Sequence, residues 1–115
     1  MIKVKRAYDK PTEDDGYRIL VDRLWPRGVA KNKAKIDLWL KQVSPSDELR
    51  RWFSHDSEKW DEFKKRYHSE LKSEKISLQK IKQIEKENKI ITLVYAAKDD
   101  KHNNAIVLAD ELRKR

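Results

Sequence analysis

Residues 90–97 read Ile-Ile-Thr-Leu-Val-Tyr-Ala-Ala, and this stretch decides the fold. It is almost unbroken in apolar character, which is typical of a central strand covered on both faces. An amphipathic segment that stops near Asn88 precedes it, and a second amphipathic segment runs from about Asn103 to Leu112 after it. A buried strand between two helices indicates an α/β protein with a largely parallel sheet.

Three further strands are predicted in the first part of the chain. Residues 2–8 alternate apolar and polar side chains, and residues 17–22 contain the apolar core Ile-Leu-Val. Residues 36–43 alternate again. A polar turn at residues 11–16 and a basic loop at residues 26–35 separate these strands. We therefore expect a small sheet of about four strands flanked by helices.

Residues 46–88 are predicted to be helical. Ser46 and Asp56 are candidate N-caps, because their side-chain oxygens can accept hydrogen bonds from free backbone N–H groups. Ser77 is a third candidate cap, with Ile76 and Ile81 at the spacing of a hydrophobic staple. One helical stripe after Asp56 is apolar and consists of Trp60, Phe63, Tyr67 and Leu71.

The composition predicts a single α/β domain over residues 1–115. Charged residues make up 42% of the chain and the net charge is +8, so the protein is basic and nucleic acid is a conceivable partner. There is no cysteine, which excludes disulfides and thiolate metal sites, and the three histidines lack metal-ligand spacing. No signal or membrane-spanning segment is visible, so a cytoplasmic protein without a membrane partner is expected, and no cofactor is identified.

The motif that most strongly indicates a functional site is Asp22-Arg23-Leu24-Trp25-Pro26-Arg27-Gly28. It comes directly after the second predicted strand. A hydrophobic core does not need this mixture, because buried ionised groups are costly unless they are paired. A binding surface does need it, since the planar guanidinium group recognises carboxylates and phosphates through two hydrogen bonds. The motif therefore indicates a site for an anion.

Other polar residues are expected to lie beside this motif. In open α/β sheets, ligands bind beyond the carboxyl ends of the strands, and polar residues follow each predicted strand of this chain. Several cations close together would favour an anion. The residues expected to form this ligand-binding site are Arg6, Tyr8, Asp22, Arg23, Trp25, Arg27, Ser46, Arg50, Lys98 and Asn103.

If the site is catalytic, His55 and Asp99 are the candidates for acid and base. His55 can equally cap the end of the preceding helix, where a cation is favoured. Ser46 is read as a cap rather than a nucleophile, because no histidine stands beside it in the sequence. Trp25 fits a core-edge position as well as a ligand-stacking one.

Motifs from Arg6 to Leu108 resemble those of the bacterial YeaO-like family of small proteins, to which no function is assigned. The resemblance implies a compact α/β domain of intracellular bacterial origin, and it implies no reaction. Ser57 departs from the proline expected after His-Asp, which affects the start of a helix and not the site. The motifs are Asp22–Gly28, Pro45-Ser46, Leu49-Arg50, Trp52-Phe53, His55-Asp56, Trp60, Phe63, Tyr67, Tyr95–Asp99 and Asn104-Ala105.

Two functions follow from these residues. The first is a pocket, rich in arginine and lysine, that binds a small phosphate- or carboxylate-bearing ligand, with or without catalysis. The second is weak nucleic-acid binding through a basic surface with interleaved aromatic residues, as at Tyr17-Arg18, Trp25–Arg27 and Arg50–Trp52. A closed pocket at the strand ends would favour the first function, and a broad basic face with exposed rings would favour the second.

Overall fold

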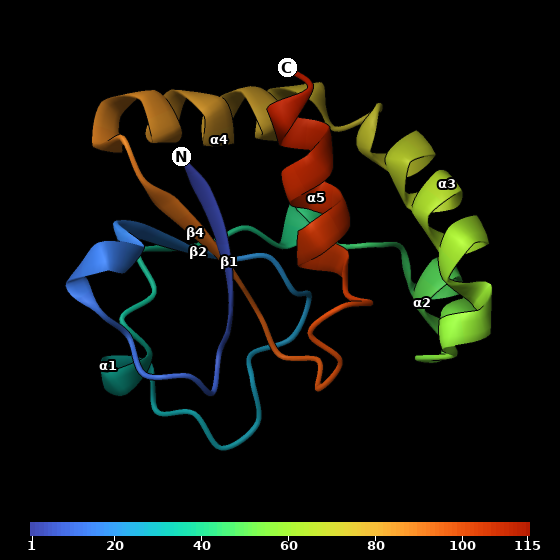
Figure 1. The fold of residues 1–115 in the computed structure, drawn as a ribbon, viewed down its shortest axis with the longest axis horizontal. Coiled ribbons are helices and arrows are strands. Elements are labelled where there is room, and N and C mark those ends of the chain that lie inside the picture. The colour runs from blue at the N-terminus through green and yellow to red at the C-terminus, as the bar shows by residue number, and fades with distance from the viewer.

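The computed structural model describes residues 1–115, and its strands alternate with helical segments along the chain (Figure 1). Three single 3₁₀ turns, η1 to η3, connect the larger elements. The elements are β1 (Ile2–Arg6), η1 (Glu13–Asp15), β2 (Tyr17–Leu20), α1 (Lys31–Ala34), β3 (Leu38–Trp39), η2 (Lys41–Val43), α2 (Asp47–Phe53), η3 (Ser57–Lys59), α3 (Trp60–Leu71), α4 (Lys75–Asn88), β4 (Ile91–Tyr95) and α5 (Asn104–Arg113).

All four strands are parallel, and they lie in the order β1-β4-β2-β3. Ile91 at the start of β4 pairs with Ile2 on one side and with Tyr17 on the other. Each residue of β4 is buried, so the prediction of a central buried strand is confirmed. The small, parallel α/β sheet expected from the sequence is confirmed as well.

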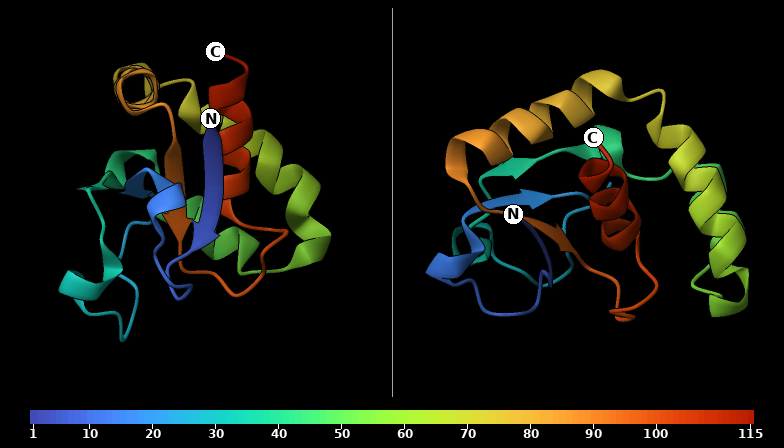
Figure 2. Two further views of the ribbon diagram at one scale, coloured as in Figure 1. Left: turned by 60° about the vertical axis from the view of Figure 1, so that its left-hand side comes forward. Right: turned by 45° about the horizontal axis from the view of Figure 1, so that its top comes forward.

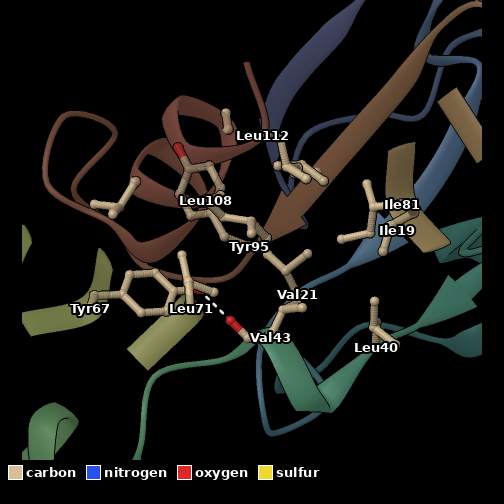
Figure 3. Packing of buried hydrophobic residues seen from close by; sticks show 14 of the residues in the cluster. Ile19, Val21, Leu40, Val43, Tyr67, Leu71, Ile81, Tyr95, Leu108 and Leu112 are labelled. Carbon is tan, nitrogen blue, oxygen red and sulfur yellow. Dashed lines mark hydrogen bonds between the residues drawn. The ribbon is translucent and has the colours of Figure 1, made fainter. Parts of the chain in front are cut away.

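The main hydrophobic core lies on the face of the sheet that α2 to α5 cover (Figure 2). Because side chains alternate along a strand, Ile19, Val21, Leu93 and Tyr95 point to this face. Figure 3 shows Tyr67 and Leu71 of α3 and Leu108 and Leu112 of α5 packing over this face. The apolar stripe predicted for residues 60–71 provides much of this cover, with Phe63, Tyr67 and Leu71 buried.

The opposite face of the sheet is covered by connecting segments and the single turn of α1. Its hydrophobic cluster is small, with Leu20, Val94 and Ala7 buried and Trp25 and Trp39 packed against it, among others. The rest of this face is polar. The sequence analysis did not anticipate that so much of one sheet face would be charged.

A buried ion pair holds the polar half of that face. Arg18 is only 3% exposed and Asp15 only 4%, and Arg18 Nη1 lies 2.7 Å from Asp15 Oδ2. Lys5 Nζ approaches the same carboxylate at 3.1 Å, and Arg18 also donates to the backbone oxygen of Ala34. Thr92 of β4 donates to the backbone oxygen of Asp15 at 2.6 Å. These bonds hold the β1–β2 and β2–β3 connections against this face of the sheet. In many parallel sheets a helix covers the face at this position instead.

Two local predictions are wrong. The third strand extends only over Leu38–Trp39, because the chain turns into η2 where residues 41–43 were expected to continue the strand. Ser77 is not a cap, since α4 begins at Lys75 after Glu74. Ile76 is 84% exposed, so it forms no staple with Ile81. None of the helices combines the length and apolar character needed to cross a membrane.

Candidate functional site

The carboxyl ends of all four strands meet at one edge of the sheet, where the polar residues of the sequence motifs also lie. The chain leaves β1 and β2 toward the face covered by connecting segments, and it leaves β4 toward α5 on the helical face (Figure 2). Neighbouring strands whose connections diverge in this way border a crevice in open α/β sheets. The candidate site is therefore the edge around the end of β4.

Asp22 lies between the ends of β2 and β4. Its Oδ2 accepts a hydrogen bond from the backbone N–H of Ala96 at 2.8 Å. Burial raises the pKa of Asp22, although the Ala96 N–H, the Asn104 amide and the nearby charges of Arg50 and His55 act in the opposite direction. The carboxylate thus joins two strand ends and is itself only partly accessible to a ligand.

Arg23 and Arg50 converge on one carboxylate, that of Asp47. Arg23 Nε lies 3.3 Å from Asp47 Oδ1, and Arg50 Nη2 donates to the same oxygen. The hydrogen bond from Arg50, with the charge of Arg23, lowers the pKa of Asp47 despite some desolvation. Asp47 was not among the residues predicted for the site, yet its single carboxylate pairs with two of the predicted ligand-binding arginines.

Ser46 caps α2, as predicted, because its Oγ accepts a hydrogen bond from the backbone N–H of Leu49 at 3.2 Å. Glu70 of α3 binds the same residue, accepting from the Ser46 N–H at 2.9 Å and from Oγ at 2.6 Å. An internal carboxylate therefore occupies the start of α2. Glu70 comes from 24 positions further along the chain, and no local sequence pattern relates it to Ser46.

A hollow of about 310 Å³ lies beside this contact. The hydroxyl of Tyr67 reaches its wall and donates to the backbone oxygen of Val43 (Figure 3). Burial, with the negative charges of Asp22 and Glu70, raises the pKa of Tyr67 well above its usual value, so the hydroxyl stays protonated. The lining is Arg23, Gln42, Ser44, Ser46, Tyr67, Glu70, Leu71, Ser73 and Glu74, in which the acids outnumber the one arginine.

A second group, which we call the cationic edge, consists of Arg6, Tyr8, Arg27 and Lys98. Arg6 Nε donates to the backbone oxygen of Ala97 at 3.0 Å, next to Lys98, and its guanidinium carbon lies 4.9 Å from the centre of the Tyr8 ring. Tyr8 Oη donates to the backbone oxygen of Arg27 at 2.9 Å. These contacts bring the ends of β1 and β4 together with the basic loop.

None of the three cations of the cationic edge has a carboxylate within ion-pair distance. Arg6 uses only Nε, so both of its terminal nitrogens are free. Carboxylates are present further away. Asp100, Asp9 and Asp99 add to the effect of burial in raising the pKa of Tyr95, and Arg6 partly opposes them.

Trp25 supports the basic loop from within. Its Nε1 donates to the backbone oxygen of Val29 at 2.7 Å, and its ring meets Trp39 edge-on with centroids 5.6 Å apart. Trp39 in turn donates to the backbone oxygen of Asp22 at 2.7 Å. The indole thus holds the loop that carries Arg27 onto the sheet, which corresponds to the core-edge interpretation of this residue.

The two acid–base candidates, His55 and Asp99, make no hydrogen bond or ion pair with each other. The Asp99 carboxylate accepts from the Lys101 N–H at 2.9 Å and contacts His102 Nδ1 at 2.8 Å, and these bonds lower its pKa. His55 is exposed after α2, with a positive φ of 57°. Asn103 is the N-cap of α5, accepting from the Ile106 N–H at 3.1 Å. No group of three or more acidic or histidine side chains is arranged to hold a metal ion.

The polar residues that follow the strands thus form two groups with different electrostatic character. Beside Asp22, Arg23 and Arg50 share the single carboxylate of Asp47. At the cationic edge, three cations are unpaired. Of the aromatic residues that the sequence placed beside basic ones, Tyr17, Trp25 and Trp52 are each half-buried, and the Trp52 ring lies under the Arg66 guanidinium group at 4.2 Å.

Comparison with known proteins gives relatives along the whole chain. Residues 1–115 match the family model described as "Inactive DUF488-N3 subclade". The chain is 43% identical over 112 residues to the uncharacterized protein YeaO of Escherichia coli (strain K12), covering 97% of this chain and 96% of that protein. It is 38% identical over 114 residues to uncharacterized proteins of Mycobacterium bovis and Mycobacterium tuberculosis, covering 99% of this chain and 95% of each relative. No solved structure matches it significantly.

Proposed function

We propose, from the premise that this chain belongs to the inactive DUF488-N3 subclade and is similar to YeaO, that it binds a small anion at the cationic edge without transforming it. The word "inactive" in the family description favours a binding role over catalysis. The binding of Asp99 by His102, without any contact to His55, favours the same role, because a general acid and base must both be available to the reacting group.

The observation that carries the proposal is the set of unpaired cations on Arg6, Arg27 and Lys98. Like charges held close together repel one another, and a bound anion relieves that repulsion. The free terminal nitrogens of Arg6 can form the paired hydrogen bonds that suit a carboxylate or phosphate. The Tyr8 ring contacts the Arg6 guanidinium group, and its hydroxyl binds the backbone oxygen of Arg27, so Tyr8 links these two residues without neutralising either charge.

The size of the anion is limited by the carboxylates near the end of β4. Asp9, Asp99 and Asp100 act on Tyr95, so they lie close to the strand end that the ligand would approach. A long polyanion that crossed this edge would meet these negative charges. A single phosphate or carboxylate group on a small metabolite would contact the cations and avoid the acids. The proposed ligand class is therefore a small phosphate- or carboxylate-bearing molecule.

Titration calorimetry with inorganic phosphate and with citrate tests the proposal, using wild type and the double variant Arg27→Gln, Lys98→Gln. Neither side chain makes an ion pair, so the fold should be retained, which circular dichroism can verify. The control is Lys80→Gln on the exposed face of α4. We expect binding in wild type and the control, and loss of binding in the double variant. Absence of binding for both anions, or equal affinity in all three proteins, would refute the cationic edge as the site.

A further inference from the structure

Basic side chains also line an open groove of about 870 Å³ at the opposite edge of the sheet, where the strands begin. The groove lies between the second half of α4, the start of β1 and the C-terminal end of α5. Figures 1 and 2 show α4 passing beside both ends of the chain. Its lining consists of Met1, Gln79, Lys82, Gln83, Glu85, Lys86, Lys89 and Arg115.

The groove carries an excess of positive charge. Its four basic side chains, Lys82, Lys86, Lys89 and Arg115, face one carboxylate, that of Glu85. Glu85 is already bound by the amino group of Met1 at 2.9 Å and by Lys82 at 3.2 Å. Lys86 and Lys89 have no carboxylate within ion-pair distance. An added anion would therefore meet two free ammonium groups and one arginine whose acidic partner, Glu111, lies outside the groove.

The arrangement of these groups suits a chain of phosphates. Gln79, Lys82, Gln83 and Lys86 lie at helical spacing along one side of α4. Lys82 and Lys86 are about 6 Å apart along the helix axis, at 1.5 Å per residue. Lys86 and Lys89, which have no acidic partner, can therefore contact phosphates of a strand that lies along this side of α4. The amides of Gln79 and Gln83 add hydrogen-bonding groups between the charges.

The wall of the groove argues against a membrane or an apolar peptide as the partner. Met1 is its only hydrophobic residue. Insertion into a bilayer requires aromatic or aliphatic side chains that enter the interface beside the basic residues. Phosphate contacts along a nucleic acid require only positive charge and polar donors.

We propose that this groove binds the phosphate backbone of nucleic acid without sequence preference. The proposal goes beyond the anion site, because the groove lies at the other edge of the sheet and shares no residue with it. Each lysine that contacts a phosphate releases condensed counterions, so the binding is expected to be weak and to decrease steeply as the salt concentration rises.

Fluorescence anisotropy with a short labelled oligodeoxynucleotide tests the proposal. For wild type we expect binding at about 50 mM salt, with a log–log slope of about −0.7 for each phosphate neutralised. The variant Lys86→Glu, Lys89→Glu should make this slope shallower by about 0.7 per residue. Lys80→Glu makes the same kind of charge change on α4 outside the groove and should leave the slope unchanged.

Three results would overturn the proposal. They are the absence of binding at low salt, an equal change of slope in Lys80→Glu, and binding to vesicles containing phosphatidylserine but not to the oligonucleotide. Circular dichroism of each variant establishes that a loss of binding does not come from unfolding.

Discussion

Asp22 Oδ2 accepts the backbone N–H of Ala96 at 2.8 Å, so a side chain at the end of β2 holds the end of β4. On the other side of β4, Arg6 Nε donates to the oxygen of Ala97 at 3.0 Å. The central strand is thus tied to both neighbours beyond the last ladder hydrogen bonds. Ala97, the residue before Lys98, is thereby held next to Arg6 at the start of the loop before α5.

Asp22→Ala should lower the free energy of unfolding by about 1–3 kcal/mol, because it leaves the Ala96 N–H without its acceptor. Asp22→Asn keeps a carbonyl oxygen at the same position and should cost much less. Urea denaturation at neutral pH measures both values. Equal losses in the two variants would indicate that the charge of Asp22, and not its acceptor, stabilises the strand ends.

The pH dependence of stability should change in opposite directions when Asp22 and Glu111 are neutralised. Burial raises the pKa of Asp22, so its ionised form is disfavoured in the fold. Protonated Asp22 contributes to the free energy of unfolding at pH values below its usual pKa of 3.8. This contribution is lost as the pH rises through the raised pKa. Asp22→Asn should therefore lose more stability than wild type when the pH is lowered through this range.

Glu111 behaves in the opposite way. Burial opposes its ionisation, but the hydrogen bond with His68 and the charge of Arg115 outweigh burial and lower its pKa. Ionised Glu111 contributes to the free energy of unfolding at pH values above its usual pKa of 4.5. This contribution is lost as the pH falls toward the lowered pKa. Glu111→Gln should therefore lose less stability than wild type on acidification. Urea midpoints at a series of pH values test both variants, and parallel curves for all three proteins would contradict the two pKa directions.

Arg18→Met should destabilise the fold by about 3–5 kcal/mol, because it leaves the buried Asp15 carboxylate with Lys5 as its only cationic partner. Adding Asp15→Asn should recover part of the loss by removing the uncompensated charge. The control Arg51→Met changes an exposed arginine without an ion pair, and it should alter stability by no more than about 0.5 kcal/mol. If Asp15→Asn restores nothing, packing rather than charge explains the loss.

The sequence predicted the parts of this fold that depend on local pattern. The apolar run at 90–97, the stripe at 60–71 and the caps Ser46 and Asp56 reflect periodicity and local hydrogen bonding, and the structure confirms them. The polar face of the sheet was not predictable in this way. Asp15 and Arg18 belong to a turn and a strand, and their burial depends on crossovers that pass over them.

The candidate site was predicted only as a set of residues. Parallel strands bring these residues to one edge, but the sequence could not divide them into a paired and an unpaired group. That division depends on two carboxylates that act through tertiary contacts. Asp47 pairs with predicted cations, and Glu70 binds the start of α2. The choice of Arg6, Arg27 and Lys98 as the free cations therefore comes from the structure.

The two glycines should differ sharply in their tolerance of alanine. At Gly16, φ is 63° and an added Cβ would lie 2.2 Å from the backbone oxygen of Ile90, which accepts the Tyr17 N–H at the start of β2. At Gly28, φ is 78° but no atom lies within 4 Å of the added Cβ. Gly28→Ala should cost about 1–2 kcal/mol from the left-handed backbone alone. Gly16→Ala should cost clearly more, and similar melting temperatures for the two variants would contradict the contact with Ile90.

The hydroxyl of Tyr8 should affect anion affinity although the proposed ligand contacts are made by cations. Tyr8→Phe keeps the ring next to the Arg6 guanidinium but removes the hydrogen bond to the Arg27 oxygen. If this hydrogen bond positions Arg27, its loss should weaken phosphate affinity by about twofold to tenfold. Tyr8→Ala removes the ring as well and should weaken binding further, because Arg6 also loses its support. Calorimetric titration of phosphate into the three proteins orders these effects. Wild-type affinity in Tyr8→Phe, with a loss in Tyr8→Ala, would show that the ring orders the cationic edge and that the position of Arg27 does not depend on the hydroxyl.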